Sequence, residues 1–182
     1  MKATGIVRRI DDLGRVVIPK EIRRTLRLRE GTPLEIFTDR EGEIILKKYS
    51  PMVELAAFAG QYAEAMSQAT GLIVCITDRD HVIAVSGGAR KELLQKAISQ
   101  SLERVINERQ TIQAGKDDKS FVRLVDEELE GITAQVVAPI ICEGDAIGAV
   151  AIMSREPRAR FGEMELKLAA TACGFLGRKM ES

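Results

Sequence analysis

The sequence predicts two domains: a small, mostly β N-terminal domain with one short helix, and a larger α+β C-terminal domain. The chain has 182 residues, which is enough for two small domains. Residues 1–52 hold twelve Lys and Arg against eight Asp and Glu, whereas residues 53–182 hold fifteen against nineteen. The apolar pattern also changes near residue 52, from short strand-like runs to helical periodicity. We therefore place the domains at 1–52 and 53–182, and we expect them to have different partners.

Two hairpins are expected in the first domain. Residues 5–10 and 15–18 are apolar runs on either side of a turn, and residues 34–37 and 43–47 repeat that arrangement. A unit of about 50 residues buries too little apolar surface to be comfortably stable alone. We therefore expect this domain to pair with a second copy of the chain.

A short helix is expected between the hairpins. Pro19 suits the first helical position and Gly31 and Pro33 end the helix, so we place it at 19–28. Four cations at i, i+3, i+4 and i+7 share one face of this helix, namely Lys20, Arg23, Arg24 and Arg27. Like charges at this spacing repel one another, so the stripe is favourable where an anion covers it.

Three further arginines lie on the first hairpin, at Arg8, Arg9 and Arg15. Guanidinium groups bind phosphates and the major-groove edge of guanine. Together with the helical stripe, these arginines predict that the partner is a double-stranded nucleic acid. The alternative is that these residues are ordinary solvent-exposed surface charges without a nucleic-acid partner.

The second domain is expected to alternate helices with strands. Helices are expected at 52–69, 90–108 and 161–180, and strands at 72–77, 82–85, 132–142 and 146–153, with a solvated loop at 114–120. The first helix carries an a/d seam that includes Leu55, Ala59, Tyr62 and Met66.

The last helix has two apolar stripes, and we expect one of them to pack on its own sheet. One stripe contains Met164, Leu168, Thr171 and Phe175, and the other contains Leu166, Ala169, Cys173, Leu176 and Met180. We assign oligomerisation to the first-helix seam and to Leu166, Ala169, Cys173 and Leu176. Burial of both stripes within one chain is the alternative.

Residues 2–49 resemble the AbrB-type transition-state regulators. The resemblance rests on Asp11, Gly14, Arg15, Val16, Ile18, Pro19, Glu21, Ile22 and Arg23, with Leu34–Phe37 and Ile44–Tyr49 downstream. It implies a swapped-hairpin β-barrel built by two interleaved chains. It also implies that Arg8, Arg15, Arg23 and Arg24 contact DNA, whereas Arg9, Lys20 and Arg27 are added from the residue pattern alone.

Over its full length the sequence resembles sporulation regulators that join such a module to a GAF domain. The GAF resemblance rests on the element order and on residues 132–140 and 146–152. It implies a tetramer, a dimer of dimers, that activates and represses late, forespore-stage genes. It also implies a small-molecule ligand, which the sequence does not identify; no other cofactor is expected.

Other classes of function are disfavoured. A single histidine, without a nucleophile motif or a Walker A motif, argues against an enzyme. Three cysteines without a CxxC pair argue against disulfides and zinc, and favour a reducing cytoplasm. No run is long and apolar enough to span a membrane. The main rival is an antitoxin that regulates its own promoter, because some antitoxins use related modules with a short toxin-binding tail.

Overall fold

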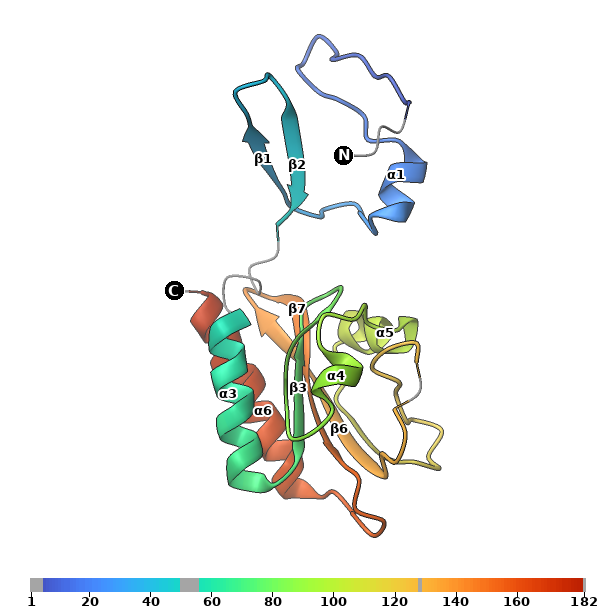
Figure 1. Cartoon of the computed structure of the whole chain (residues 1–182), viewed down its shortest axis with the longest axis vertical. Coiled ribbons are helices and arrows are strands. Elements are labelled where there is room, and N and C mark those ends of the chain that lie inside the picture. Colours follow the sequence, from blue (N-terminus) through green and yellow to red (C-terminus); the bar gives the residue numbers. More distant parts are fainter. Residues whose placement is uncertain (1–4, 50–55, 128, 182) are drawn as a thin grey trace. The chain divides into compact units, whose positions relative to one another are not determined.

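The computed structural model describes residues 5–49, 56–127 and 129–181. The chain forms two compact units, Met1–Tyr49 and Ser50–Ser182 (Figure 1). The boundary expected after residue 52 falls within 50–55, outside the described residues. Each unit is described by itself below.

The first unit contains one short helix and one hairpin. Helix α1 spans Lys20–Thr25, and strands β1 (Leu34–Thr38) and β2 (Ile44–Lys48) pair in antiparallel register from Leu34 with Lys48 to Thr38 with Ile44. The second expected hairpin is therefore confirmed. The strands expected at 5–10 and 15–18 are not formed in the single chain. Their side chains are mostly exposed, as expected where the strand partners come from a second chain.

The end of α1 corrects the predicted position of one residue. Arg27 does not lie on the helix: it adopts a left-handed conformation, with φ of 51°. The backbone N–H of Leu28 donates to Arg23 O (2.7 Å) and that of Arg27 donates to Arg24 O (3.3 Å). This is a Schellman ending, in which a residue with positive φ follows the helix. The cationic stripe on α1 is therefore limited to Lys20, Arg23 and Arg24.

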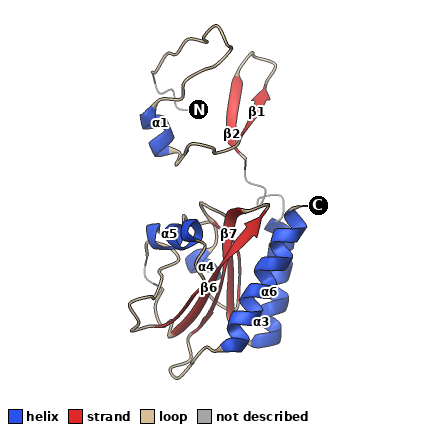
Figure 2. Ribbon diagram, turned by 180° about the vertical axis from the view of Figure 1, so that it is seen from behind, coloured by secondary structure: helices blue, strands red, loops and turns tan. Residues whose placement is uncertain are grey.

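The second unit is built on a five-stranded antiparallel sheet with the order β4-β3-β7-β6-β5. The strands are β3 (Ile73–Thr77), β4 (Val82–Ser86), β5 (Ile112–Gly115), β6 (Ala134–Cys142) and β7 (Asp145–Ser154). Helices α3 (Ala56–Thr70) and α6 (Glu163–Met180) cover one face (Figure 2). Helices α4 (Arg90–Leu93) and α5 (Gln100–Glu108) lie against the other.

Alternating side chains divide the core into two layers. On β7, Ala151 and Met153 face α4 and α5, whereas Val150 and Ile152 face α3 and α6. Neighbouring residues of an extended strand point to opposite faces. Because helices cover both faces, the central strands are mostly apolar.

The helix expected at 90–108 is instead two helices. Gln95 has a φ of 65°, and the connecting segment forms isolated bridges from Ala97 to His81 and from Ile98 to Val125. Ser99 then caps α5 by accepting the N–H of Leu102 at 3.1 Å. The loop expected at 114–120 is also shorter, because β5 continues to Gly115.

The structure reverses the assignment of the two stripes on α6. Ala169, Cys173 and Leu176 are buried against the sheet of their own unit, and Leu166 packs beside them. The stripe left at the surface holds Met164, with 68% of its surface exposed, and Phe175, with 44%. Gly177 explains this orientation, because a Cβ at that position would lie 2.1 Å from Ile141 O. The helix can approach β6 this closely only with glycine there.

The seam on α3 also packs within its own unit. Ala59 has 0% of its surface exposed, and Tyr62 and Met66 pack against the same core layer. Tyr62 stacks on Phe175 of α6, with ring centroids 5.3 Å apart. Ala59 therefore cannot face a partner, which corrects its assignment. Tyr62 and Met66 pack within their own unit and remain partly exposed, so their contact with a partner stays a prediction. Leu55 lies outside the described residues.

Candidate nucleic-acid interface

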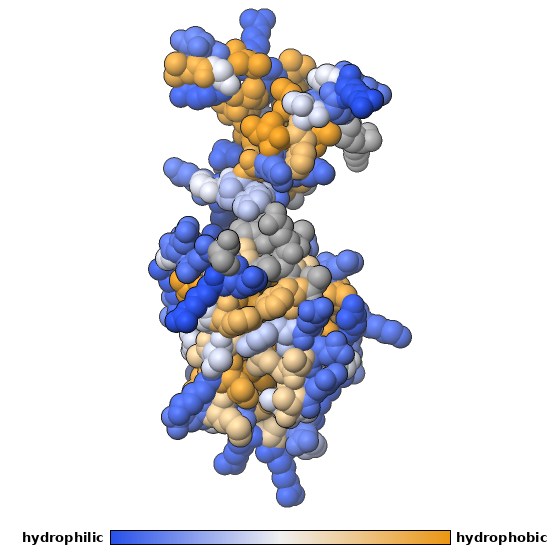
Figure 3. Space-filling view, turned by 90° about the vertical axis from the view of Figure 1, so that its left-hand side faces the viewer, coloured by the Kyte–Doolittle hydropathy of each residue, from blue (hydrophilic) through white to orange (hydrophobic). Residues whose placement is uncertain are grey.

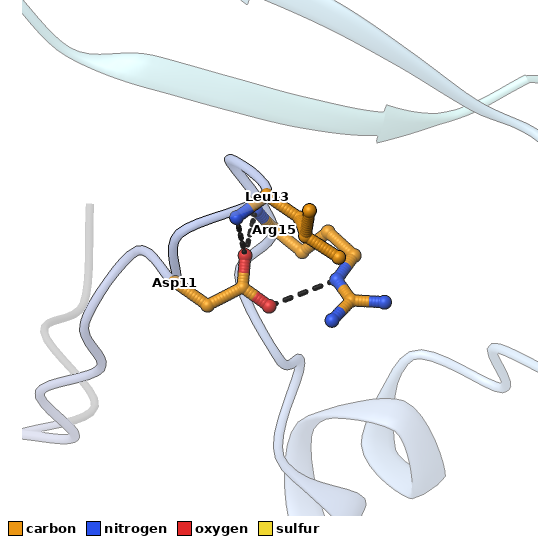
Figure 4. Close-up of polar contacts among 3 residues, drawn as sticks. All are labelled: Asp11, Leu13 and Arg15. Atoms are coloured by element: carbon orange, nitrogen blue, oxygen red, sulfur yellow. Dashed lines mark hydrogen bonds and ion pairs between the residues drawn. The ribbon is translucent and has the colours of Figure 1, made fainter.

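The turn before α1 is organised by one carboxylate, that of Asp11 (Figure 4). Its Oδ1 accepts the backbone N–H groups of Leu13 (3.0 Å) and Arg15 (2.8 Å). Its Oδ2 accepts Nε of Arg15 at 2.8 Å. Gly14 takes the position with positive φ, at 76°, and donates to Asp11 O. Asp11 therefore fixes both the turn and the direction of the Arg15 side chain.

These bonds lower the pKa of the Asp11 carboxyl. The largest cause is the backbone N–H of Arg15, followed by its guanidinium group. The side chain of Arg15 remains 69% exposed, so the ion pair leaves much of it open to a further anion. The sequence places Asp11 in the AbrB-type motif but did not lead us to assign it this role, although an Asp three residues before a Gly is a signal for such a turn.

All seven cations predicted to bind DNA are exposed. Lys20, Arg23 and Arg24 share the short helix α1, none of whose residues is buried. Arg15 lies on the segment that leads into that helix, and Arg27 immediately follows it. The structure therefore presents these charges on α1 and the residues adjoining it. Arg8 and Arg9 lie on the segment before the turn, where Nη1 of Arg8 donates to Val7 O at 3.2 Å.

Apolar side chains accompany these charges on the surface of the first unit, drawn in orange in Figure 3. Exposed fractions exceed one third for Ile6, Val7, Ile10, Leu13, Val16, Val17, Leu26, Ile36, Phe37, Ile44 and Leu46. Single exposed apolar residues are ordinary, but so many in a unit this small indicate an interface with another protein surface.

A second candidate site is a cavity on the α4/α5 face of the second unit. Its volume is about 400 Å³. Gln135 and Met153 of the sheet line one side, and Phe121, Leu124 and Ile132 are among the residues that line the other. The lining also includes Lys116, Arg123, Glu127 and Glu130. The cavity therefore combines apolar walls with charges of both signs, which suits a small polar molecule.

Comparison with known proteins identifies both units. Residues 54–181 match the family described as stage V sporulation protein T C-terminal, transcription factor. Over 181 residues the chain is 56% identical to stage V sporulation protein T of Bacillus subtilis (strain 168), covering 100% of this chain and 99% of that protein. This chain belongs to the stage V sporulation protein T family. The family is one of sporulation transcription factors, not of enzymes.

The first unit of this family member is an AbrB-type DNA-recognition domain. It is 65% identical over 51 residues to the transition state regulatory protein AbrB of Bacillus subtilis (strain 168), covering 28% of this chain and 52% of that protein. Residues 7–53 also match the family described as antidote-toxin recognition MazE, bacterial antitoxin. The predicted DNA-binding class of the first unit is thus confirmed, whereas the roles of individual arginines remain predictions.

The second unit has the GAF fold. It resembles the GAF domain region of a membrane protein from Geobacter sulfurreducens, with a TM-score of 0.54 and 17% identity over 70% of this chain and 93% of that chain. It also resembles the cofactor-binding GAF domain of the nutrient sensor CodY from Clostridium difficile, with a TM-score of 0.52 and 14% identity over 66% of this chain and 83% of that chain. Among the described residues, no helix is long and apolar enough to cross a membrane.

Proposed function

We propose that this chain regulates late, forespore-stage sporulation genes in the cytoplasm, activating some and repressing others. The single observation that supports this most strongly is the full-length match to stage V sporulation protein T. The exposed arginines of the first unit supply the chemistry, because guanidinium groups bind DNA phosphates and base edges.

In this proposal two chains complete each DNA-binding unit. The exposed apolar residues of the first unit supply the surface for pairing. Pairing brings two copies of Arg8, Arg15, Arg23 and Arg24 onto one DNA duplex. The exposed stripe on α6, represented by Met164 and Phe175, then joins two pairs into a tetramer. Two DNA-binding units held together increase affinity through effective concentration.

Sensing of a small molecule is the second part of the proposal. The cavity of about 400 Å³ lies in a GAF fold and has both polar and apolar lining residues. A ligand there alters DNA binding only if its affinity for the DNA-binding form of the assembly differs from its affinity for the other forms. Comparing DNA affinity with and without each candidate metabolite tests this part, and unchanged affinity rejects that compound.

The antitoxin alternative is supported by the first unit alone. The match to the antitoxin family ends at residue 53, whereas residues 54–181 match a transcription factor. A long domain with two buried core layers also differs from a short toxin-binding tail. We therefore favour the sporulation regulator.

Fluorescence anisotropy with promoter-region DNA tests the DNA-binding surface. The Arg23→Ala/Arg24→Ala variant should lose most of its affinity in an assembly of unchanged mass. For the unaltered protein, about eight arginine–phosphate contacts per pair of chains predict a slope of log K against log salt near −7.

A variant that removes the same charge elsewhere provides the control. Arg104 and Arg158 are exposed residues of the second unit, so Arg104→Ala/Arg158→Ala should retain DNA affinity. A salt slope near −1, or equal affinity of the two double variants, contradicts the proposed surface.

A further inference from the structure

One glutamine is completely enclosed on the α4/α5 face of the sheet. Gln135 lies on β6 and has 0% of its surface exposed. Its side-chain amide faces the backbone of Val122: the nitrogen donates to Val122 O at 3.0 Å and the oxygen accepts Val122 N at 2.5 Å. A buried amide is strongly disfavoured without partners, so these two bonds determine where Val122 meets the sheet.

Val122 belongs to a strap, defined here as residues 121–125. The other attachment of the strap is the start of α5. The backbone N–H of Ser99 donates to Leu124 O at 2.9 Å, and its hydroxyl donates to Arg123 O at 2.5 Å. An isolated bridge pairs Val125 with Ile98. The polar attachments of the strap are therefore a helix cap on one side and the Gln135 side chain on the other, and Val122, Leu124 and Val125 are also buried in the core layer.

The strap forms part of the cavity wall. Residues 121–124 line the cavity of about 400 Å³, and Gln135 and Met153 line it from the sheet. At Val122 the strap is attached to the sheet through a side chain. A side chain can rotate and exchange partners, whereas residues within a strand ladder separate only together.

We propose that the strap opens and closes over the cavity and that Gln135 is its latch. This inference rests on the proposed sensing function and specifies its regulation: the cavity widens for a ligand when Val122 separates from Gln135. In the unliganded protein the same two bonds hold Val122 against the sheet. The strap thereby sets how often the wide form of the cavity is populated, independently of the affinity of any ligand for its walls.

Hydrogen exchange of backbone amides in the full-length protein tests the latch. Gln135→Met keeps the length of the side chain and removes both bonds to Val122. Amides throughout the strap should exchange about tenfold faster, as expected for the loss of two ordinary hydrogen bonds. The β6–β7 ladder should keep its protection. Three results would overturn the proposal. Exchange in the strap could be unchanged, it could change at Val122 alone, or exchange in the β6–β7 ladder could accelerate equally.

A matched glutamine serves as the control. Gln113 lies exposed on β5, and its Nε2 donates to Phe161 O at 2.7 Å. Gln113→Met should leave exchange in the strap unchanged. If Gln113→Met accelerates amide exchange in the strap as much as Gln135→Met does, the effect is not specific to the latch and the proposal fails.

A conservative variant makes the latch titratable. In Gln135→Glu, the neutral carboxyl can donate to Val122 O and accept its N–H, whereas the ionised form cannot donate. Burial raises the pKa of an introduced carboxyl at this position. Relative to the unaltered protein at the same pH, strap exchange should therefore be similar at low pH, where the carboxyl is neutral, and about tenfold faster near about pH 8, where it is ionised. The neighbouring Lys116, Arg123, Glu127 and Glu130 are common to both proteins. A ratio that does not change with pH contradicts the latch.

This test is independent of DNA binding. The Arg23→Ala/Arg24→Ala variant should lose DNA affinity while its strap exchanges normally. A failed latch therefore leaves the DNA-binding proposal standing. Conversely, faster strap exchange in Gln135→Met supports the latch even if the Arg23→Ala/Arg24→Ala variant retains DNA affinity.

Discussion

At the scale of single residues, Asp11 connects the backbone geometry of a turn to the direction of Arg15, a proposed DNA contact. Its carboxylate holds the turn through two backbone N–H groups and holds Arg15 through Nε. Removing a negative charge usually strengthens DNA binding by reducing repulsion. Here the same change also releases the turn and the arginine, so the two effects oppose each other.

We predict that Asp11→Ala weakens DNA binding, because Arg15 loses its fixed direction and binding must then restrict it. Asp12→Ala removes the same charge next to the turn and should bind DNA as well as the unaltered protein, or better. Anisotropy titrations at equal salt compare the two variants. Tighter binding by Asp11→Ala would show that repulsion outweighs positioning.

The pKa of Asp11 gives this interaction a defined pH range. Because hydrogen bonds lower the pKa of the folded state, the contribution to stability is complete above the ordinary carboxyl range and is lost only as pH falls through the lowered value. The difference in DNA affinity between Asp11→Ala and the unaltered protein should therefore be constant from about pH 5 to about pH 8. A difference that changes within this range would contradict the lowered pKa.

The cysteines should differ in reactivity towards a thiol reagent. Burial raises the pKa values of Cys75 and Cys173 to about 12. Partial burial raises the pKa of Cys142, and the neighbouring Glu181, Glu143 and Asp145 raise it further. In the native protein we expect one slow reaction per chain, at Cys142, because the thiolate is the reactive form. Fast labelling of two or three thiols before unfolding would contradict this order.

At the scale of elements, glycine determines how closely α6 packs on the sheet. Gly177 faces Ile141 O, whereas a Cβ at Gly174 on the same helix meets nothing within 4 Å. Gly177→Ala should lower the free energy of unfolding by about 1–3 kcal/mol through overpacking. Gly174→Ala should raise it by about 0.5–1 kcal/mol, because alanine loses less backbone entropy on folding. Urea unfolding at one protein concentration measures both, and equal effects would contradict the close approach.

Local pattern predicted most of the elements, because periodicity and turn residues act over a few positions. The turn between β6 and β7 is an example: Glu143 and Gly144 both have positive φ, and Gly144 signals such a turn in the sequence. The break between α4 and α5 was missed because it depends on bridges to His81 and Val125, which are distant in sequence. The pairing of Gln135 with Val122 was missed for the same reason.

The two stripes on α6 show the limit of periodicity at this scale. Both stripes are apolar, so spacing alone does not distinguish the face that meets the sheet from the face that meets solvent. Contacts across the fold decide it, through Gly177 against Ile141 and through the Cys173 thiol, which donates to Ala138 O at 3.3 Å. The exposed arginines of the first unit, by contrast, could be predicted from the sequence. Charged side chains usually lie at the surface, so their exposure does not depend on knowing how the fold packs.

At the scale of the whole molecule, the surface stripe on α6 predicts how pairs of chains assemble. Met164→Glu places a charge on this stripe and should convert a tetramer into a dimer, since burying an unpaired carboxylate is costly. DNA affinity should fall by about a hundredfold through lost avidity. Light scattering and anisotropy on the same sample measure the two effects. Ala170→Glu alters an exposed position outside the stripe and should change neither quantity; a tetrameric Met164→Glu protein would place the contact elsewhere.

The uncovered apolar residues of the first unit also affect how the regulator responds to its own abundance. In the proposed assembly a second chain completes each DNA-binding unit, so formation of that unit is a bimolecular reaction. While most chains are still unpaired, doubling their concentration increases the number of completed units about fourfold by mass action. The promoters would consequently stay unoccupied during early synthesis and fill over a narrow range of protein level, so that the timing of the response follows from accumulation of the chain.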